Sequence, residues 1–152
     1  MTINTQKVVV GGLAAGIVAF VLDFVLNGLL LAGVWEAAMT ALNPALAEGM
    51  ESAGAFLGFL IVDIAWGVLL VWLYAAIRPR FGPGAGTAIK AAVAAWLITG
   101  IPWSSLSVMG IFSWSTFVLG AVTWLVVSVA AALVGARLYT EEAPAPSPAM
   151  GA

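Results

Sequence analysis

The chain has 152 residues, of which 63% are hydrophobic and 8% are charged, and its formal net charge is −2 at pH 7. So apolar a composition excludes a soluble domain, and the length suffices for one compact helical bundle in a membrane. Because the chain contains no cysteine and no histidine, we expect no disulfide, no metal site and no other cofactor. We also expect no nucleic-acid partner, since there is no basic face to neutralise phosphates.

The sequence predicts an all-α fold, a four-helix transmembrane bundle over residues 1–139. The four apolar segments cover about 8–35, 53–77, 87–103 and 112–138, which is enough to span a bilayer. The third is the shortest, and we expect it to end at Pro102, whose ring removes a backbone N–H. The remaining segment, 140–152, is rich in proline and alanine and is expected to be a disordered cytoplasmic tail.

Two connections contain recognisable turn and cap residues. In "LNPALAEGM", Asn43 followed by Pro44 matches a helix cap with proline at the first helical position. This pattern predicts a short outer helix at the membrane interface between the first and second spans. The segment "RPRFGPG", residues 78–84, combines proline and glycine and predicts a tight turn. The second and third spans should therefore be antiparallel neighbours.

Charge indicates how the chain is threaded. The basic residues all fall on one side of the predicted bundle: Lys7, Arg78, Arg80, Lys90 and Arg137. The opposite connection, after Trp35, carries Glu36, Glu48 and Glu51 without any lysine or arginine. By the positive-inside rule both termini are cytoplasmic, so the bundle is N-in and C-in. Trp35 and Trp103 then fall near the outer interface, where tryptophan anchors are common.

Two aspartates interrupt the apolar spans. Asp23 lies near the middle of the first span and Asp63 near the middle of the second. Because these spans run in opposite directions, the two carboxyl groups come out at similar depth, within roughly 5 Å. A carboxylate at mid-bilayer costs about 2.5 to 3.5 kcal/mol, so each should face protein or water rather than lipid. No basic residue lies at that depth, and we expect at least one carboxyl group to be protonated at neutral pH.

Small and polar residues repeat on the faces that carry these aspartates. Asn27 follows Asp23 by one turn, and Gly67 follows Asp63 by one turn with Trp66 beside it. Gly12 and Gly16 form a GxxxG motif that allows close helix approach. The candidate binding residues are Asp23, Asn27, Asp63 and Trp66. The candidate packing residues are Gly12, Gly16, Ala19, Gly67 and Gly120.

Two function classes are compatible with these residues. The first is assembly, in which polar and small residues hold helices together in a homo-oligomer or in an accessory subunit of a larger membrane complex. The second is a small proton- or cation-coupled transporter that uses Asp23 and Asp63. An enzyme is not expected, because the only catalytic candidate is an aspartyl dyad and the glycine-flanked motif of intramembrane aspartyl proteases is absent.

Two resemblances extend this interpretation. The segments "GGLAAGIVAF", "LNGLLLAGVWEAAM" and "VWLYAAIRPRFGPG" resemble parts of small four-span bacterial inner-membrane proteins that have no assigned activity. That resemblance implies a bacterial inner membrane and says nothing about a substrate. The layout of four spans with an acid in the first is similar to that of the small multidrug exporters, although no motif aligns and this chain has a second buried acid.

Overall fold

The computed structural model describes residues 3–140, and every regular element in that range is helical. The elements are α1 (Thr5–Asp23), η1 (Phe24–Leu30, a π-helix), α2 (Ala32–Leu42), α3 (Pro44–Met50), α4 (Ala53–Phe81), α5 (Ala85–Val108) and α6 (Trp114–Leu138). Four stretches are long and apolar enough to cross a membrane, namely Thr5–Leu30, α4, α5 and α6. The prediction of an all-helical protein with four such segments is therefore confirmed. The predicted tail lies outside the described residues, apart from Thr140.

The outward faces of the long helices carry large apolar side chains. Leu30, Ile61 and Ile98 expose 71%, 68% and 69% of their surface. Exposing such apolar faces to water is unfavourable, whereas lipid tails solvate them. The exposure pattern therefore agrees with the lengths of the helices in indicating a membrane protein.

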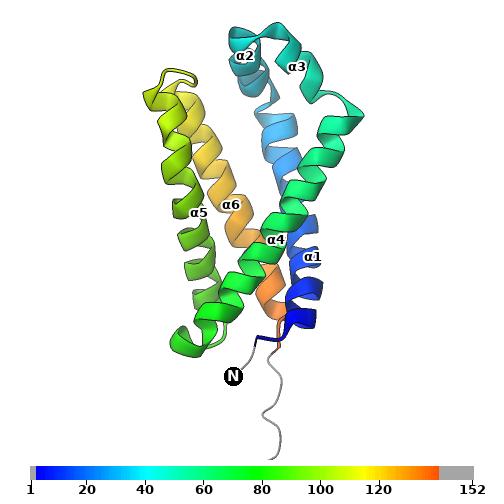
Figure 1. Cartoon of the computed structure of the whole chain (residues 1–152), viewed down its shortest axis with the longest axis vertical. Helices are drawn as coiled ribbons and strands as arrows, with labels where there is room; N and C mark the ends of the chain where they lie inside the picture. The colour runs from blue at the N-terminus through cyan, green and yellow to red at the C-terminus, as the bar shows by residue number, and fades with distance from the viewer. Residues whose placement is uncertain (1–2, 141–152) are drawn as a thin grey trace, which may run out of the picture.

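The helices form a bundle that is closed at one end and splayed at the other (Figure 1). α1 packs on α4 and α6, and α5 packs on α6 and α4, while α1 and α5 make no contact in the part of the chain described. The N-terminal end of α1 and the C-terminal end of α6 lie together at the closed end. α2 and α3 lie at the splayed end, between η1 and the start of α4.

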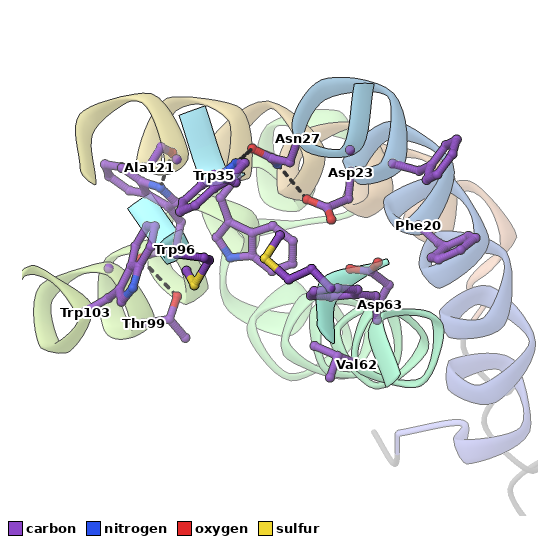
Figure 2. Close-up of a pocket in the computed structure, with 18 of the residues that line it drawn as sticks. Phe20, Asp23, Asn27, Trp35, Val62, Asp63, Trp96, Thr99, Trp103 and Ala121 are labelled. Atoms are coloured by element: carbon purple, nitrogen blue, oxygen red, sulfur yellow. Dashed lines mark hydrogen bonds between the residues drawn. The ribbon is translucent and has the colours of Figure 1, made fainter. Parts of the chain in front are cut away.

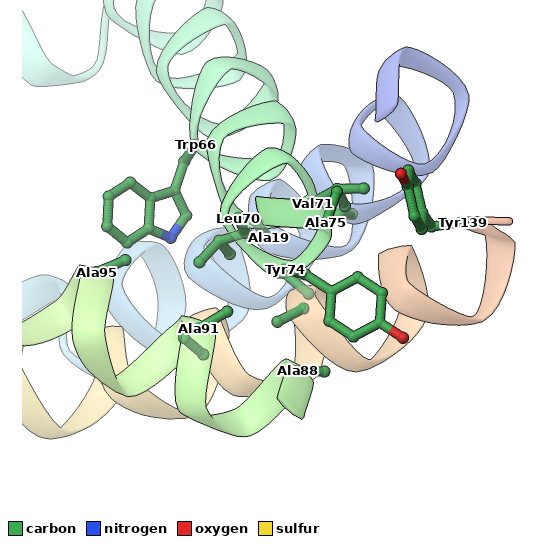
Figure 3. Close-up of a cluster of buried hydrophobic side chains, with 14 of the residues drawn as sticks. Ala19, Trp66, Leu70, Val71, Tyr74, Ala75, Ala88, Ala91, Ala95 and Tyr139 are labelled. Atoms are coloured by element: carbon green, nitrogen blue, oxygen red, sulfur yellow. The ribbon is translucent and has the colours of Figure 1, made fainter. Parts of the chain in front are cut away.

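Side-chain size explains this shape. The closed half, which is the part of the bundle around Leu70, Ala91 and Ala131, contains the buried core (Figure 3). There α5 contributes only alanines, spaced by three or four residues so that they share one face: Ala88, Ala91, Ala92 and Ala95. Small side chains let helix backbones approach closely. Toward the other end α5 carries the much larger side chains of Trp96 and Trp103, which line a cavity in the bundle.

Glycines form the tightest contact, where α1 crosses α4. A Cβ atom on Gly12 would lie 2.6 Å from the Val68 Cα, and one on Gly16 would lie 2.5 Å from the Ile64 Cα. A Cβ atom on Gly67 would overlap the backbone of Gly12 and Gly16. Ala19, one turn beyond Gly16, is fully buried. The crossing therefore has no room for a side chain on any of the three glycines.

The boundaries of the first span differ from the prediction. The helix that begins at Thr5 does not continue to Trp35 but changes to π-helical geometry at Phe24 and bends at Leu31. The separate helix α2 follows, although the run from Gly28 to Val34 contains neither a proline nor a polar residue that would predict a break. The predicted short helix after Asn43 is present as α3, and the Asn43 side chain accepts a hydrogen bond from the Ala45 N–H.

The third segment does not end at Pro102, so that prediction is wrong. α5 continues through Pro102 to Val108. The Ser104 hydroxyl donates to the Ile101 carbonyl at 2.7 Å and the Ser105 hydroxyl donates to the Pro102 carbonyl at 2.6 Å. These two bonds lie in the turn after the proline, whereas the carbonyl group that Pro102 leaves without a backbone donor is that of Ile98, four residues earlier. Helices in membranes tolerate an internal proline of this kind. The second segment is also longer than predicted and ends at Phe81, before a turn in which Gly82 and Gly84 have positive φ.

Candidate functional site

A cavity of about 510 Å³ occupies the open half of the bundle, which is the part around Asn27, Phe59 and Trp103. This volume is in the range that holds a drug-sized molecule. The cavity is lined by helices η1, α2, α4, α5 and α6 and by the C-terminal ends of α1 and α3 (Figure 2). Its wall contains nine aromatic side chains: Phe20, Phe24, Trp35, Phe56, Phe59, Trp96, Trp103, Phe112 and Trp124.

Asp63 presents a carboxyl group to this cavity from α4. Its side chain is 2% exposed, and its Oδ2 atom is buried without any hydrogen-bond partner among the described residues. Buried polar atoms in proteins are nearly always paired, because an unpaired one costs about 1 to 3 kcal/mol. The Asp63 carboxyl group therefore has unused capacity to accept a hydrogen bond from something in the cavity.

Asp23, at the end of α1, belongs to a hydrogen-bonded network. The Asn27 amide Nδ2 donates to Asp23 Oδ1 at 2.7 Å. The Asn27 Oδ1 atom accepts from the Trp35 indole N–H at 3.0 Å and from the Thr123 hydroxyl at 3.2 Å. Asn27 thereby links α1, α2 and α6 and holds Asp23 in a fixed orientation.

The structure brings Asp23 and Asp63 to the same cavity. Their carboxyl groups point into a shared space from facing helices (Figure 2), and they are close enough for their charges to interact. The lining contains no lysine and no arginine. The basic residues lie near the closed end instead, on the first turn of α1, the second turn of α5 and the last turns of α4 and α6. A cavity with two acids and no base has a negative potential whenever either acid is ionised.

The close contact of α1 with α4 at the glycines determines the position of Asp63. A Cβ atom on Gly16 would lie 2.9 Å from the carbonyl oxygen of Asp63 itself, so the α1 backbone touches the turn of α4 that carries the acid. Asp23 follows Gly16 by two turns on the same helix. The predicted packing residues and the predicted binding residues thus belong to one arrangement, in which a close crossing determines the relative position of the two carboxyl groups.

Aromatic pairs form the walls around these acids. Trp35 and Trp103 stack with ring centroids 6.3 Å apart and planes 26° apart, and both rings lie against Gly120. A Cβ atom on Gly120 would lie 2.6 Å from the Trp103 ring. On the opposite side, Phe20 meets Phe56 edge to face at 5.1 Å. Gly120 therefore makes space for the tryptophan pair.

Trp66, one of the candidate binding residues, is not among the residues that line the cavity. Its side chain is buried in the core, and its indole N–H donates to the Ser128 hydroxyl at 3.1 Å. It also packs against Trp124, with ring centroids 5.2 Å apart, and Trp124 does line the cavity. Trp66 and Trp124 together form the floor that separates the cavity from the closed half.

Sequence reasoning missed several lining residues. Trp35 and Trp103 were expected to be membrane-interface anchors, whereas the bend at Leu31 turns Trp35 back toward Asn27. Phe20, Phe56 and Met39 also line the cavity. Phe20 carried one signal, since it precedes Asp23 by three residues and so lies on the same side of the helix.

The cavity is suited to binding a positive charge attached to an apolar body. Aromatic faces attract cations, and carboxylates attract them more strongly. Among the described residues no three acidic side chains come together in a way that could hold a metal ion. Comparison of the chain with protein-family models, with curated proteins and with solved structures gives no match.

Proposed function

We propose that this membrane protein is a small carrier that exchanges protons for a cation, with Asp23 and Asp63 as its charge-binding groups. One observation carries the proposal: both carboxyl groups face a single intramembrane cavity that contains no basic side chain. Acids inside a membrane mark ion or substrate pathways, and they need a positive charge or a proton to be stable there. The two acids are assigned to binding rather than to catalysis.

The proposal includes the orientation of the chain in the membrane. The basic residues cluster at the end where the chain begins and α6 ends, and Glu36, Glu48 and Glu51 lie on or beside α2 and α3 at the other end. We place both termini in the cytoplasm of a bacterium and α3 at the outer interface of its plasma membrane. Because the chain lacks cysteine, single substitutions Glu48→Cys and Arg80→Cys can be labelled separately. A membrane-impermeant maleimide added to whole cells should modify the first only, and the reverse result would invert the topology.

Exchange can be measured in liposomes. Purified protein is reconstituted into vesicles that contain the pH indicator pyranine, a pH gradient is imposed, and ethidium is added outside as the probe cation. The wild type should dissipate the gradient faster than protein-free vesicles, and Asp23→Asn and Asp63→Asn should abolish the difference. Glu36→Gln is the matched control, because Glu36 is exposed and does not line the cavity. Dissipation no faster than in protein-free vesicles would contradict the carrier function.

Assembly is the second candidate, and one surface feature favours it. Gly54 and Gly58 form a second GxxxG motif on α4, and both glycines are exposed with open space where a side chain would be. Such a motif on a membrane-facing helix permits close pairing with another helix, from a second copy or from a larger complex. Cross-linking in native membranes tests this role: wild-type protein should form a specific cross-linked species, and Gly58→Leu should remove it.

A further inference from the structure

We propose that the ligand of the cavity is an amphiphilic amine that carries a protonated N–H group, bound through Asp63, with an aromatic or branched apolar body against the tryptophans. This inference rests on the proposed function and names the chemical class of the cation.

The hydrogen-bonding groups of the wall are already used by the protein. The Trp96 indole N–H donates to the Ala121 carbonyl at 2.8 Å, and the Trp35 indole N–H donates to Asn27. The Thr99 hydroxyl donates to carbonyl groups of its own helix. A ligand with several polar groups would therefore find few partners, whereas an apolar body loses nothing on entering. This favours a ligand whose polarity is confined to one point.

Asp63 supplies that one point. Asp63 is 2% exposed, and its buried Oδ2 atom accepts no hydrogen bond within the described residues. A quaternary ammonium group could neutralise the charge of Asp63 but could not fill this vacant acceptor position, because it has no N–H. A protonated primary, secondary or tertiary amine provides both the charge and the donor, which makes a charge-assisted hydrogen bond.

Asp23 has a different role in this arrangement. Its Oδ1 atom accepts from Asn27, which is itself held by Trp35 and Thr123. The geometry therefore assigns direct contact with the amine to Asp63, and to Asp23 a second negative charge at a fixed place beside it. Asp23 and Asp63 are the only titratable groups in the lining, and α5 and α6 contribute none.

Binding to protein in lipid nanodiscs tests the inference by isothermal titration calorimetry, with empty nanodiscs as the control for partition into lipid. Three probes share one naphthalene body: 2-(1-naphthyl)-N,N-dimethylethylamine, its N,N,N-trimethyl quaternary counterpart, and neutral 1-ethylnaphthalene. The wild type should bind the protonated tertiary amine about tenfold or more tightly than either other probe, because only the amine can make the charged hydrogen bond. This comparison needs no variant and so does not depend on a substituted protein folding.

Variants locate the contact. Asp63→Asn should remove the advantage of the amine over the quaternary probe, Asp23→Asn should weaken both charged probes by a similar factor, and Glu36→Gln should change nothing. Equal affinity of the wild type for all three probes, or no binding above empty nanodiscs, would overturn the inference. Amine binding without proton exchange in the pyranine assay would overturn the carrier function and leave the ligand class standing. Exchange of ethidium without a preference for the amine probe would overturn the ligand class and leave the carrier function standing.

Discussion

The closed and open halves of the bundle are built from different residues and do different things. The closed half brings backbones together through glycine and alanine, so that Gly12, Gly16 and Gly67 leave no space between α1 and α4. In the open half, tryptophan and phenylalanine side chains from several helices surround a cavity of about 510 Å³. The close crossing of α1 and α4 lies directly beside the cavity. It can therefore set the positions of two carboxyl groups without packing the volume between them.

The largest effect should come from the glycine crossing. Gly67→Ala puts a methyl group against the backbone of Gly12 and Gly16, neither of which can move without separating α1 from α4. Overpacking of this kind should lower the free energy of unfolding by about 3 kcal/mol. Equilibrium unfolding in mixed SDS micelles measures it.

Gly58→Ala is the matched control on the same helix. Gly58 is exposed and nothing lies within 4 Å of the added methyl group, so the substitution should raise stability by about 0.5 to 1 kcal/mol through helix propensity. If both alanine substitutions shift unfolding in the same direction, the crossing is not the tight contact described above.

The next largest loss of stability should come from the floor formed by Trp66 and Trp124. Trp66→Phe removes the indole N–H and leaves the fully buried Ser128 hydroxyl without its partner, which should lower stability by about 1 to 2 kcal/mol. Trp114→Phe changes a largely exposed tryptophan and should have little effect. In a double-mutant cycle, adding Ser128→Ala to Trp66→Phe should cost little more, because the bond is already lost. Additive losses would show that the two side chains act independently.

The hydrogen bonds of Asn27 should contribute somewhat less to the free energy of unfolding. Asn27→Ala deletes hydrogen bonds to Asp23, Trp35 and Thr123. Because polar contacts between membrane helices average about 0.6 kcal/mol each, the total loss should be about 1 to 2 kcal/mol in the same unfolding assay. Thr99→Val removes a hydroxyl that bonds only its own helix and should change stability by less than about 0.5 kcal/mol.

Replacing the two acids should change the free energy of unfolding in opposite directions. This effect is the smallest and the most specific. Asp63→Leu removes a buried carboxyl group that has no hydrogen-bond partner in the described chain, so stability should rise by about 1 kcal/mol while ligand binding is lost. Asp23→Leu leaves the Asn27 amide without an acceptor and should not stabilise the protein. A loss of stability in both variants would mean that the acids are structural.

The sequence predicts most of the closed half and only part of the open one. Hydropathy is a property of long segments, so four membrane-crossing helices could be recognised, and opposite chain directions placed Asp23 and Asp63 at matching depth. Which aromatic rings turn inward depends on the bend at Leu31, and no residue type marks that bend. α5 continues through Pro102 because a membrane helix can tolerate the loss of one backbone hydrogen bond at a proline, and the residue type alone does not show where this happens. Trp66 lies beside Asp63 in sequence, yet its ring turns toward Ser128 rather than into the cavity.

Exchange of protons for a cation requires that protons leave the protein when the cation binds, and these protons can be counted. Calorimetric titration of 2-(1-naphthyl)-N,N-dimethylethylamine into the nanodisc protein, repeated in buffers with different ionisation enthalpies, gives that number. If the acids of the empty cavity hold a proton that the cation displaces, the wild type should release a proton on binding and Asp63→Asn should release none. Binding without proton release, with the same heat in both proteins, would contradict the exchange of protons for a cation at Asp63.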